Sequence, residues 1–201
     1  MPLQTIDPPM AAFEAVRSTM ADLVAQSGFR TPALRRADPA AIALSSPHRT
    51  AILGLDRIKG AKDLRSAAKI TGWRFLVHHE TTVVAAVDAV QTKKNQYSLG
   101  HVNEGPFVAG TESAIRRAET LDQIRERSFA PIFLLVPAVY VAALWLEDQT
   151  GNADLVMVIP PSPKELTPFS PLPVTQFLES LTPLAALVPP EDRKAKRPSG
   201  G

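Results

Sequence analysis

The segment TGWRFLVHHETTVVAAVDAVQ, residues 71–91, constrains the fold more than any other part of the chain. Trp73, Phe75 and Val77 alternate with other side chains, and a second run rich in β-branched residues follows over 82–90. A period of two is typical of a strand with one buried face. The two runs therefore predict a β-hairpin that turns near HETT.

Other segments extend this pattern of strands. Residues 96–102 follow the polar turn TKKN and predict a third strand, and two apolar runs around TGN predict a second hairpin. TAILGL, 50–55, is consistent with a buried strand. The prolines of 30–49 restrict that segment to short elements, and 59–70 fits either a surface helix or a loop. Three consecutive strands favour an antiparallel arrangement.

Apolar residues at helical spacing predict helices over 8–26 and 111–126, with a short third helix from Val174. Asp7 is a suitable cap for the first helix, and Gly110 or Thr111 for the second. The prolines between 160 and 190 predict an extended connector before the third. The expected fold class is α+β, an antiparallel sheet of hairpin-connected strands with helices packed mainly on one face.

Composition indicates a single globular domain over 1–190 followed by a flexible basic tail over 191–201. The chain is 45% hydrophobic and 21% charged, which is a globular balance. The tail has four basic and two acidic side chains, so it accounts for the whole formal net charge of +2. Because the remaining body is neutral, we expect no nucleic acid among the partners.

The chain has no cysteine, which excludes thiol nucleophiles, thiolate metal ligands, iron–sulfur clusters and disulfides. No basic segment precedes an apolar stretch at the N-terminus, so the expected location is cytoplasmic. We predict no cofactor.

The segment GPFVAGTE, 105–112, contains Gly105 and Gly110 at the separation found in phosphate-binding loops. Thr111 and Glu112 stand where such a loop has lysine and serine or threonine, so the charge for terminal phosphates is missing. A structural connection between strand and helix is the favoured interpretation. The alternative is a ligand site formed by Gly105, Gly110, Thr111 and His101.

Two further groups of side chains are candidate metal ligands. In HHE, His78 and Glu80 share one side of an extended chain, and His101 on a neighbouring strand could complete a set of two histidines and one carboxylate. Solvated histidines at the end of a strand are the favoured interpretation. EDQTGNAD, 147–154, departs from a calcium loop in the position of its glycine and lacks the distal glutamate, so turn geometry explains it better.

Residues 129–146 form an uncharged stretch of 18 residues, at the lower limit for a membrane span. Pro131 and Pro137 would interrupt a helix. Two buried strands joined at Pro137 are therefore favoured over membrane docking, and a membrane is an unlikely partner.

The chain contains no G-x-S-x-G elbow and no complete catalytic set. We therefore expect a non-enzymatic cytoplasmic protein that acts by binding another protein, of an accessory or immunity and inhibitor type. One alternative is a small-molecule-binding protein or enzyme with its site at the 100–112 loop and His78 and His101. The other is association with a membrane through 129–146.

Overall fold

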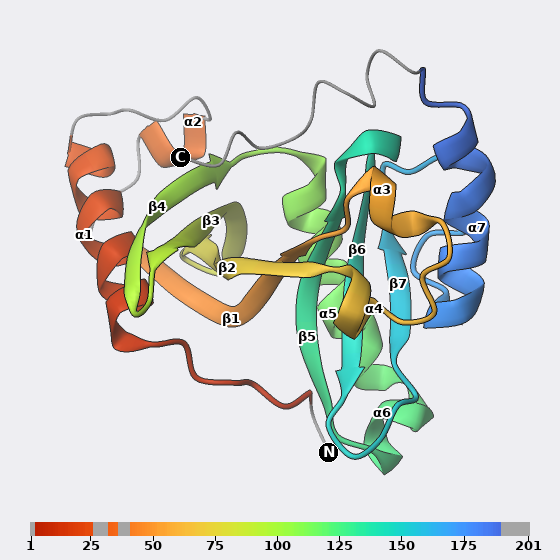
Figure 1. Ribbon diagram of the computed structural model, residues 1–201. Coiled ribbons are helices and arrows are strands. Elements are labelled where there is room, and N and C mark those ends of the chain that lie inside the picture. Colours follow the sequence, from red (N-terminus) through yellow and green to blue (C-terminus); the bar gives the residue numbers. More distant parts are fainter. Residues whose placement is uncertain (1–2, 26–31, 36–40, 190–201) are drawn as a thin grey trace.

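The computed structural model describes residues 3–25, 32–35 and 41–189. One sheet of eight strands runs through the molecule in the order β4-β3-β2-β1-β5-β6-β7-β8 (Figure 1). Its strands are β1 (Ile42–Ile52), β2 (Lys69–His79), β3 (Thr82–Lys93), β4 (Gln96–Asn103), β5 (Phe129–Val136), β6 (Val141–Asp148), β7 (Leu155–Ile159) and β8 (Pro171–Pro173). Among the eight strands of the described residues only β1 and β5 pair in parallel, so the predicted α+β class with a mostly antiparallel sheet is confirmed.

The helices are distributed along the whole chain. Three have more than twelve residues: α1 (Met10–Ala25), α5 (Pro106–Thr120) and α7 (Val174–Ala186). The short ones are α2 (Pro32–Arg35), α3 (Leu55–Ile58), α4 (Leu64–Ala67), α6 (Asp122–Glu126) and the 3-10 turn η2 (Pro137–Val139). Apart from the short helices, a helix followed by four strands occurs twice, with β1 and β5 side by side where the two halves meet.

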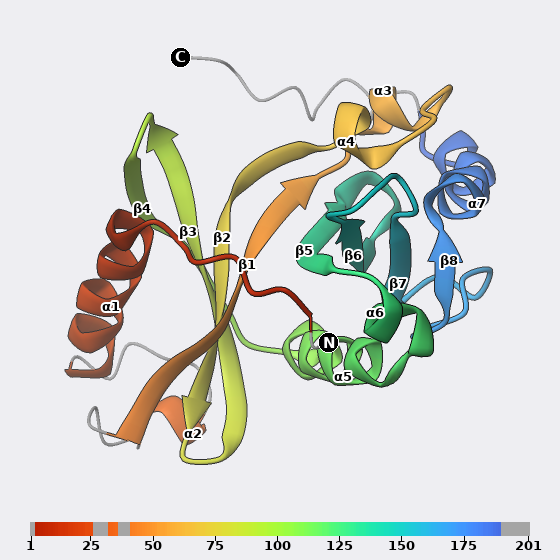
Figure 2. The same ribbon diagram turned by 90° about the horizontal axis from the view of Figure 1, so that it is seen from below.

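The long helices cover both faces of the sheet. In the first half, α1 packs on the face that carries Trp73, Phe75 and Val77, whereas Val108 of α5 packs on the opposite face against Leu76. In the second half, α5 contacts the face of Phe133, and α7 contacts the face of Trp145. The register of β1 with β5 places α1 and α7 on one face, as predicted for the terminal helices, and α5 on the other (Figure 2).

The structure corrects the prediction that 30–49 holds only short elements, because β1 begins at Ile42 and continues through Pro47. Two residues of β1, Ser46 and Pro47, lie between the pairs Ser45–Leu76 and His48–Arg74, where β2 has one residue. This is a β-bulge, and Ser46 has a left-handed φ of 47° in it. The bulge tolerates a proline inside a central strand because an inserted residue needs no ladder hydrogen bond.

The start of the second long helix was also predicted incorrectly. It begins at Pro106, five residues before the predicted position, and Leu121 separates it from α6. Pro106 occupies the first helical position, where its fixed φ is favourable and no N–H is needed. Gly105 precedes it with a φ of 153°, a conformation that only glycine adopts readily.

The hairpins were predicted correctly. β2 and β3 turn between His79 and Thr82, β4 follows as the third strand, and β6 and β7 flank TGN. The ambiguous segment 59–70 contains both α4 and the start of β2. The proline-rich connector includes the short strand β8. The basic tail predicted for 191–201 lies outside the described residues.

Candidate functional site

The two edge strands of the sheet differ in length and composition. β8 has three residues, and prolines occupy its first and last positions. β4 has eight residues, QYSLGHVN, without a proline or an acidic, lysine or arginine side chain. Prolines and charges are the usual means by which edge strands avoid pairing with other chains. Within the described part of the chain, β4 pairs only with β3, so its outer backbone is the less protected edge.

The side chains of β4 divide into two classes. Tyr97, Leu99 and Val102 are partly buried and belong to the cluster beneath α1. Ser98 and His101 are exposed. The apolar class fixes the register of β4 against α1 and β3, because a shift by one residue would expose it. These side chains therefore hold β4 on the face that packs against α1.

A bulge interrupts β4 in its second half. Gly100 and His101 lie opposite the single residue Asp88, between the pairs Val87–Val102 and Ala89–Leu99. A side chain at Gly100 would clash with Val90, which explains the glycine. A second register shift lies between Tyr97 and Gln96 of β4. Bulges increase local twist and disturb the hydrogen-bonding pattern, so the regular part of the outer edge is 97–99.

A buried polar cluster lies behind β4. The guanidinium of Arg74 donates to the carboxylate of Asp88 through Nε at 2.6 Å and Nη2 at 2.8 Å. Asn103 of β4 donates to the same carboxylate at 3.2 Å. The side chains of Arg74 and Asp88 are 4% and 14% exposed, so this bidentate pair is largely removed from water. The cluster links β2, β3 and β4 in one hydrogen-bonded unit.

His48 lies beside this cluster and is also buried. Its Nδ1 lies 2.6 Å from the carbonyl oxygen of Ser46 in the bulge, which is consistent with an Nδ1–H donor, and Nε2 has no hydrogen-bond partner among the described residues. Burial lowers the pKa of His48 to about 4, and the nearby Arg74 acts in the same direction. The imidazole is therefore neutral near pH 7.

The structure does not bring the predicted metal ligands together. His78 pairs with Val83, whereas His101 lies opposite Asp88, five positions further along β3. At the rise of a strand this separates the two histidines by about 16 Å along the strand direction. Their strands, β2 and β4, also have β3 between them. Glu80 is exposed at the turn of the hairpin with a φ of 55°. Within the described ranges, no group of three histidine or acidic side chains could hold a metal ion.

The predicted ligand loop is largely a helix. Gly105 caps α5, whereas Gly110 and Thr111 lie inside it and are buried. A Cβ at Gly110 would lie 2.5 Å from Cγ2 of Ile159 and 3.1 Å from the carbonyl oxygen of Pro160. The Thr111 hydroxyl donates to the carbonyl oxygen of Phe107 at 2.7 Å. These two residues thus make the close packing of α5 on β7, while His101 lies apart on β4.

The uncharged stretch 129–146 is the hairpin of β5 and β6 at the centre of the second half, joined by η2 at Pro137. The two-strand interpretation is confirmed. No helix in the described ranges is long and apolar enough to cross a membrane.

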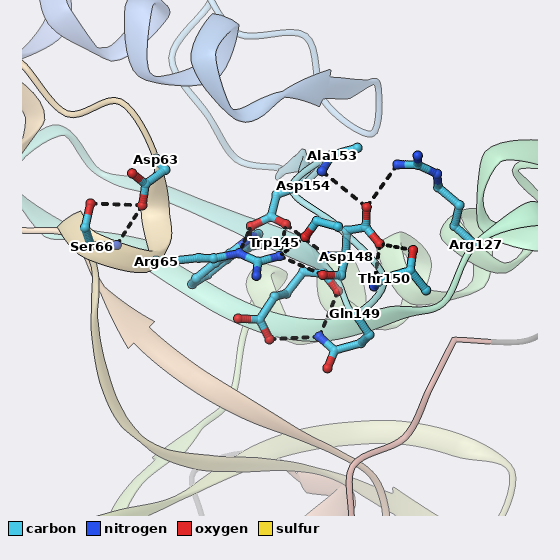
Figure 3. Close-up of polar contacts among 12 residues, drawn as sticks. Asp63, Arg65, Ser66, Arg127, Trp145, Asp148, Gln149, Thr150, Ala153 and Asp154 are labelled. Carbon is cyan, nitrogen blue, oxygen red and sulfur yellow. Dashed lines mark hydrogen bonds and ion pairs between the residues drawn. The ribbon is translucent and has the colours of Figure 1, made fainter.

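Both aspartates of the acidic loop EDQTGNAD accept hydrogen bonds from other residues of the chain (Figure 3). Asp154 is buried and accepts hydrogen bonds from Arg65 of α4, from the indole N–H of Trp145 at 3.0 Å and from the N–H of Asp148 at 3.0 Å. Arg65 also donates to the carbonyl oxygens of Asp148 and Gly151. The loop is therefore tied to α4 rather than arranged around an ion.

Asp148 stabilises the same loop from within. Burial alone would raise the pKa of its carboxyl, but hydrogen bonds from Thr150 and Ala153 and the charge of Arg127 outweigh burial and hold the pKa below its ordinary value. Asp63 caps α4 by accepting from the N–H and hydroxyl of Ser66, which lowers its pKa and positions the helix that carries Arg65.

Sequence reasoning missed the residues that distinguish this region, namely Arg74, Asp88 and Ser98. A signal for the first two was present, since each is the only charged side chain in an otherwise apolar run of its strand. Such residues in adjacent strands of a hairpin are candidates for a cross-strand pair. The exposure of Ser98 at an edge depends on strand order, which has no local signal.

Comparisons with known proteins found no match for the chain among family models, curated proteins or solved structures.

Proposed function

We propose that this protein is a non-enzymatic cytoplasmic protein of an accessory or inhibitor type, and that it binds another protein through the outer edge of β4. The observation that carries this proposal is the contrast between the two edges. β8 is short and contains Pro171 and Pro173, whereas β4 is longer, uncharged and free of proline. An extended segment of a partner adds to such an edge as a further strand.

The support behind β4 suits this role. Main-chain hydrogen bonds provide affinity in strand addition, and they require an edge that is already in strand geometry. Tyr97 and Leu99 pack under α1 on one face, and Asn103 is held by Asp88 on the other. Because the strand is fixed from both faces, little conformational entropy is lost at β4 when a partner strand pairs with it.

The partner needs matching chemistry along a short segment. The regular edge covers 97–99, and the exposed Lys93 and Lys94 precede it in the chain. We expect a proline-free extended segment with an acidic residue near these two lysines, because opposite charges set register and orientation.

The experiment compares capture from native lysate by the wild-type protein, Ser98→Lys and Gln123→Lys. Both positions are exposed, but Ser98 lies on the β4 edge and Gln123 on α6. A lysine on the edge opposes strand pairing, so a stoichiometric partner should remain with wild type and Gln123→Lys and be lost from Ser98→Lys.

A second readout locates the contact directly. Hydrogen exchange of the amides of 97–99 should slow when the captured partner is added back to the purified protein. Absence of any stoichiometric partner, or a partner that Ser98→Lys retains, would refute the proposal.

A further inference from the structure

We infer that mild acid favours opening of the first half of the sheet, β1 to β4 with α1, and leaves the second half, β5 to β8 with α7, in place. The buried His48 is the group that makes the first half sensitive to acid. The inference concerns the chain alone and does not rest on the proposed function.

The two halves meet over a short contact. Within the described residues β1 pairs with β5 only over Arg49–Ile52, whereas it pairs with β2 over Ile42–Ile52. Each half also has an apolar cluster of its own, with Trp73 beneath α1 and Trp145 beneath α7 (Figure 2). Regions of this kind open as separate cooperative units when their stabilities differ.

All four histidines of the chain lie in the first half. His48 is in β1, His78 and His79 end β2, and His101 is in β4. Histidine is the side chain whose charge ordinarily changes between about pH 5 and pH 8. Any histidine charge that acidification adds in this range therefore belongs to the first half.

His48 differs from the other three in its burial. It is 2% exposed, whereas the others are half-buried or exposed. Its Nδ1 is held by the carbonyl oxygen of Ser46 in the bulge, and Nε2 has no hydrogen-bond partner among the described residues. Protonation would give Nε2 a hydrogen that none of these residues accepts. A buried charged donor without an acceptor is strongly unfavourable.

The charged side chains of the neighbouring strands do not compensate such a charge. Arg74 faces His48 from β2 and repels an imidazolium. Asp88 faces it from β3, but both of its carboxylate oxygens already accept hydrogen bonds from Arg74. If Asp88 turned to the imidazolium, it would release Arg74. Arg74 also contacts Phe133 of β5, so its release would weaken the link between the two halves.

The other elements on this face provide no free carboxylate. β5, the second neighbour of β1, has no charged residue. Glu112 of α5 is paired with Arg116. Glu104, between β4 and α5, is half-buried and engaged within the chain. An imidazolium at His48 is therefore unpaired as long as the first half stays closed.

Opening of the first half relieves this conflict. Burial lowers the pKa of His48 to about 4 in the closed state, and exposure to water returns it to its ordinary value of 6.5. Between these two values the open state binds a proton that the closed state does not bind. A fall in pH through this range therefore shifts the equilibrium toward opening.

The second half has no such response in this range. Its buried charges are Asp148 and Asp154. Burial opposes ionisation of Asp148, but hydrogen bonds from Thr150 and Ala153 and the charge of Arg127 hold its pKa below the ordinary value of 3.8. Stabilisation of this kind is complete above the ordinary value and is lost as pH falls below it. At pH 5 the acidic loop therefore still stabilises the second half.

The two tryptophans of the chain report on the two halves separately. Trp145→Phe leaves Trp73 as the reporter of the first half, and Trp73→Phe leaves Trp145 as the reporter of the second. Urea unfolding of each variant is followed by tryptophan fluorescence at pH 7 and pH 5. The midpoint from Trp73 should fall by about 1 M in urea, and the midpoint from Trp145 by less than half as much.

His48→Gln in the Trp145→Phe background should remove most of this fall, because glutamine does not titrate. His101→Gln in the same background makes the same change at an exposed position and should retain the fall. Circular dichroism establishes that each variant is folded. Equal falls at the two tryptophans, or a fall that persists in His48→Gln, overturns the inference.

Hydrogen exchange of the wild-type protein is a second test that needs no substitution. After correction for the intrinsic effect of pH, protection of the amides of 73–77 in β2 and 85–89 in β3 should decrease about tenfold or more between pH 7 and pH 5. Protection of 142–146 in β6 should be retained. Equal losses in the two halves would also overturn the inference. Neither measurement involves a partner, so the proposed function stands or fails separately.

Discussion

Arg74 lies over the ring of Phe133, with its guanidinium carbon 3.6 Å from the ring centroid. Arg74 belongs to β2 and Phe133 to β5, and β1 lies between these strands. The contact crosses the line where the two halves of the sheet meet. One buried cation thus joins the halves through the ring and anchors β3 and β4 through Asp88.

We expect Asp88→Ala to lower the free energy of unfolding by about 3 kcal/mol or more, because it leaves the buried Arg74 without its counter-ion. Arg74→Met combined with Asp88→Ala should cost less than the sum of the single changes, since the double variant has no unpaired buried charge. Urea unfolding of the four proteins measures the coupling.

The control for this cycle is Glu112→Ala. It breaks the pair of Glu112 with Arg116 on α5, where the arginine side chain is 71% exposed. An exposed pair within one helix contributes about 0.5 kcal/mol or less. Equal losses for Asp88→Ala and Glu112→Ala would contradict the role assigned to the buried pair.

His48 should make stability depend on pH. Its pKa is about 4 in the folded protein and has an ordinary value of 6.5, so the unfolded chain takes up the proton first as pH falls. The stabilisation is complete above pH 6.5 and decreases between pH 6.5 and 4. The loss approaches roughly 3 kcal/mol, from the difference between these two pKa values.

His48→Gln should flatten the pH dependence of the free energy of unfolding in this window, whatever its effect on stability at pH 7. His101→Gln makes the same change at an exposed position outside the cluster. Denaturant unfolding at several pH values gives the slopes. Identical slopes for wild type and His48→Gln would show that the imidazole does not titrate differently on folding.

Gly110→Ala tests whether Gly110, which was a candidate ligand residue in the segment 105–112, is required for close packing of α5. The added methyl meets Ile159 and the carbonyl oxygen of Pro160. Overpacking of this kind costs about 1–3 kcal/mol, which exceeds the gain of up to about 1 kcal/mol from replacing glycine in a helix. The melting temperature should therefore fall. Ser113→Ala in the same helix is the control, and an unchanged or higher melting temperature for Gly110→Ala would contradict the packing role.

The sequence predicted those elements whose signal is local. The alternation in β2, the turn at HETT and the two runs around TGN each lie within one short continuous segment, and they gave the two correct hairpins. Only the last residues of β1, 50–52, were expected in a strand, because Pro47 resembles a strand breaker unless the bulge is known. That bulge depends on pairing with β2, about thirty residues away.

The candidate site was less predictable than the fold. β4 was expected as a strand, but its place at the edge follows from the parallel pairing of β1 with β5, for which no local pattern exists. The histidines and glycines attracted interest by residue type. The structure places His78 and His101 beside different residues of β3, Gly105 at the cap of α5 and Gly110 inside it. A metal or ligand site built from residues of several strands cannot be assigned before the strand order is known.

Trp145 provides the most stringent test of the second half of the core. It is 2% exposed, and its indole N–H donates to the buried carboxylate of Asp154. Trp145→Ala should cost about 3–5 kcal/mol because it removes a large buried ring and leaves a cavity. Trp145→Phe retains most of the apolar volume, so its cost should be smaller.

Comparison of these variants with Asp154→Asn separates the ring from its hydrogen bond. Asp154→Asn keeps the size of the side chain and weakens the charge-assisted bonds from Arg65. Trp145→Phe has no indole N–H to donate to residue 154. If the hydrogen bond from Trp145 contributes to stability, adding Asp154→Asn should therefore destabilise Trp145→Phe less than it destabilises wild type. Thermal unfolding of wild type, Trp145→Phe, Asp154→Asn and the double variant at pH 7 measures this difference. A melting temperature of Trp145→Ala equal to that of wild type would mean that the ring is not part of the core beneath α7.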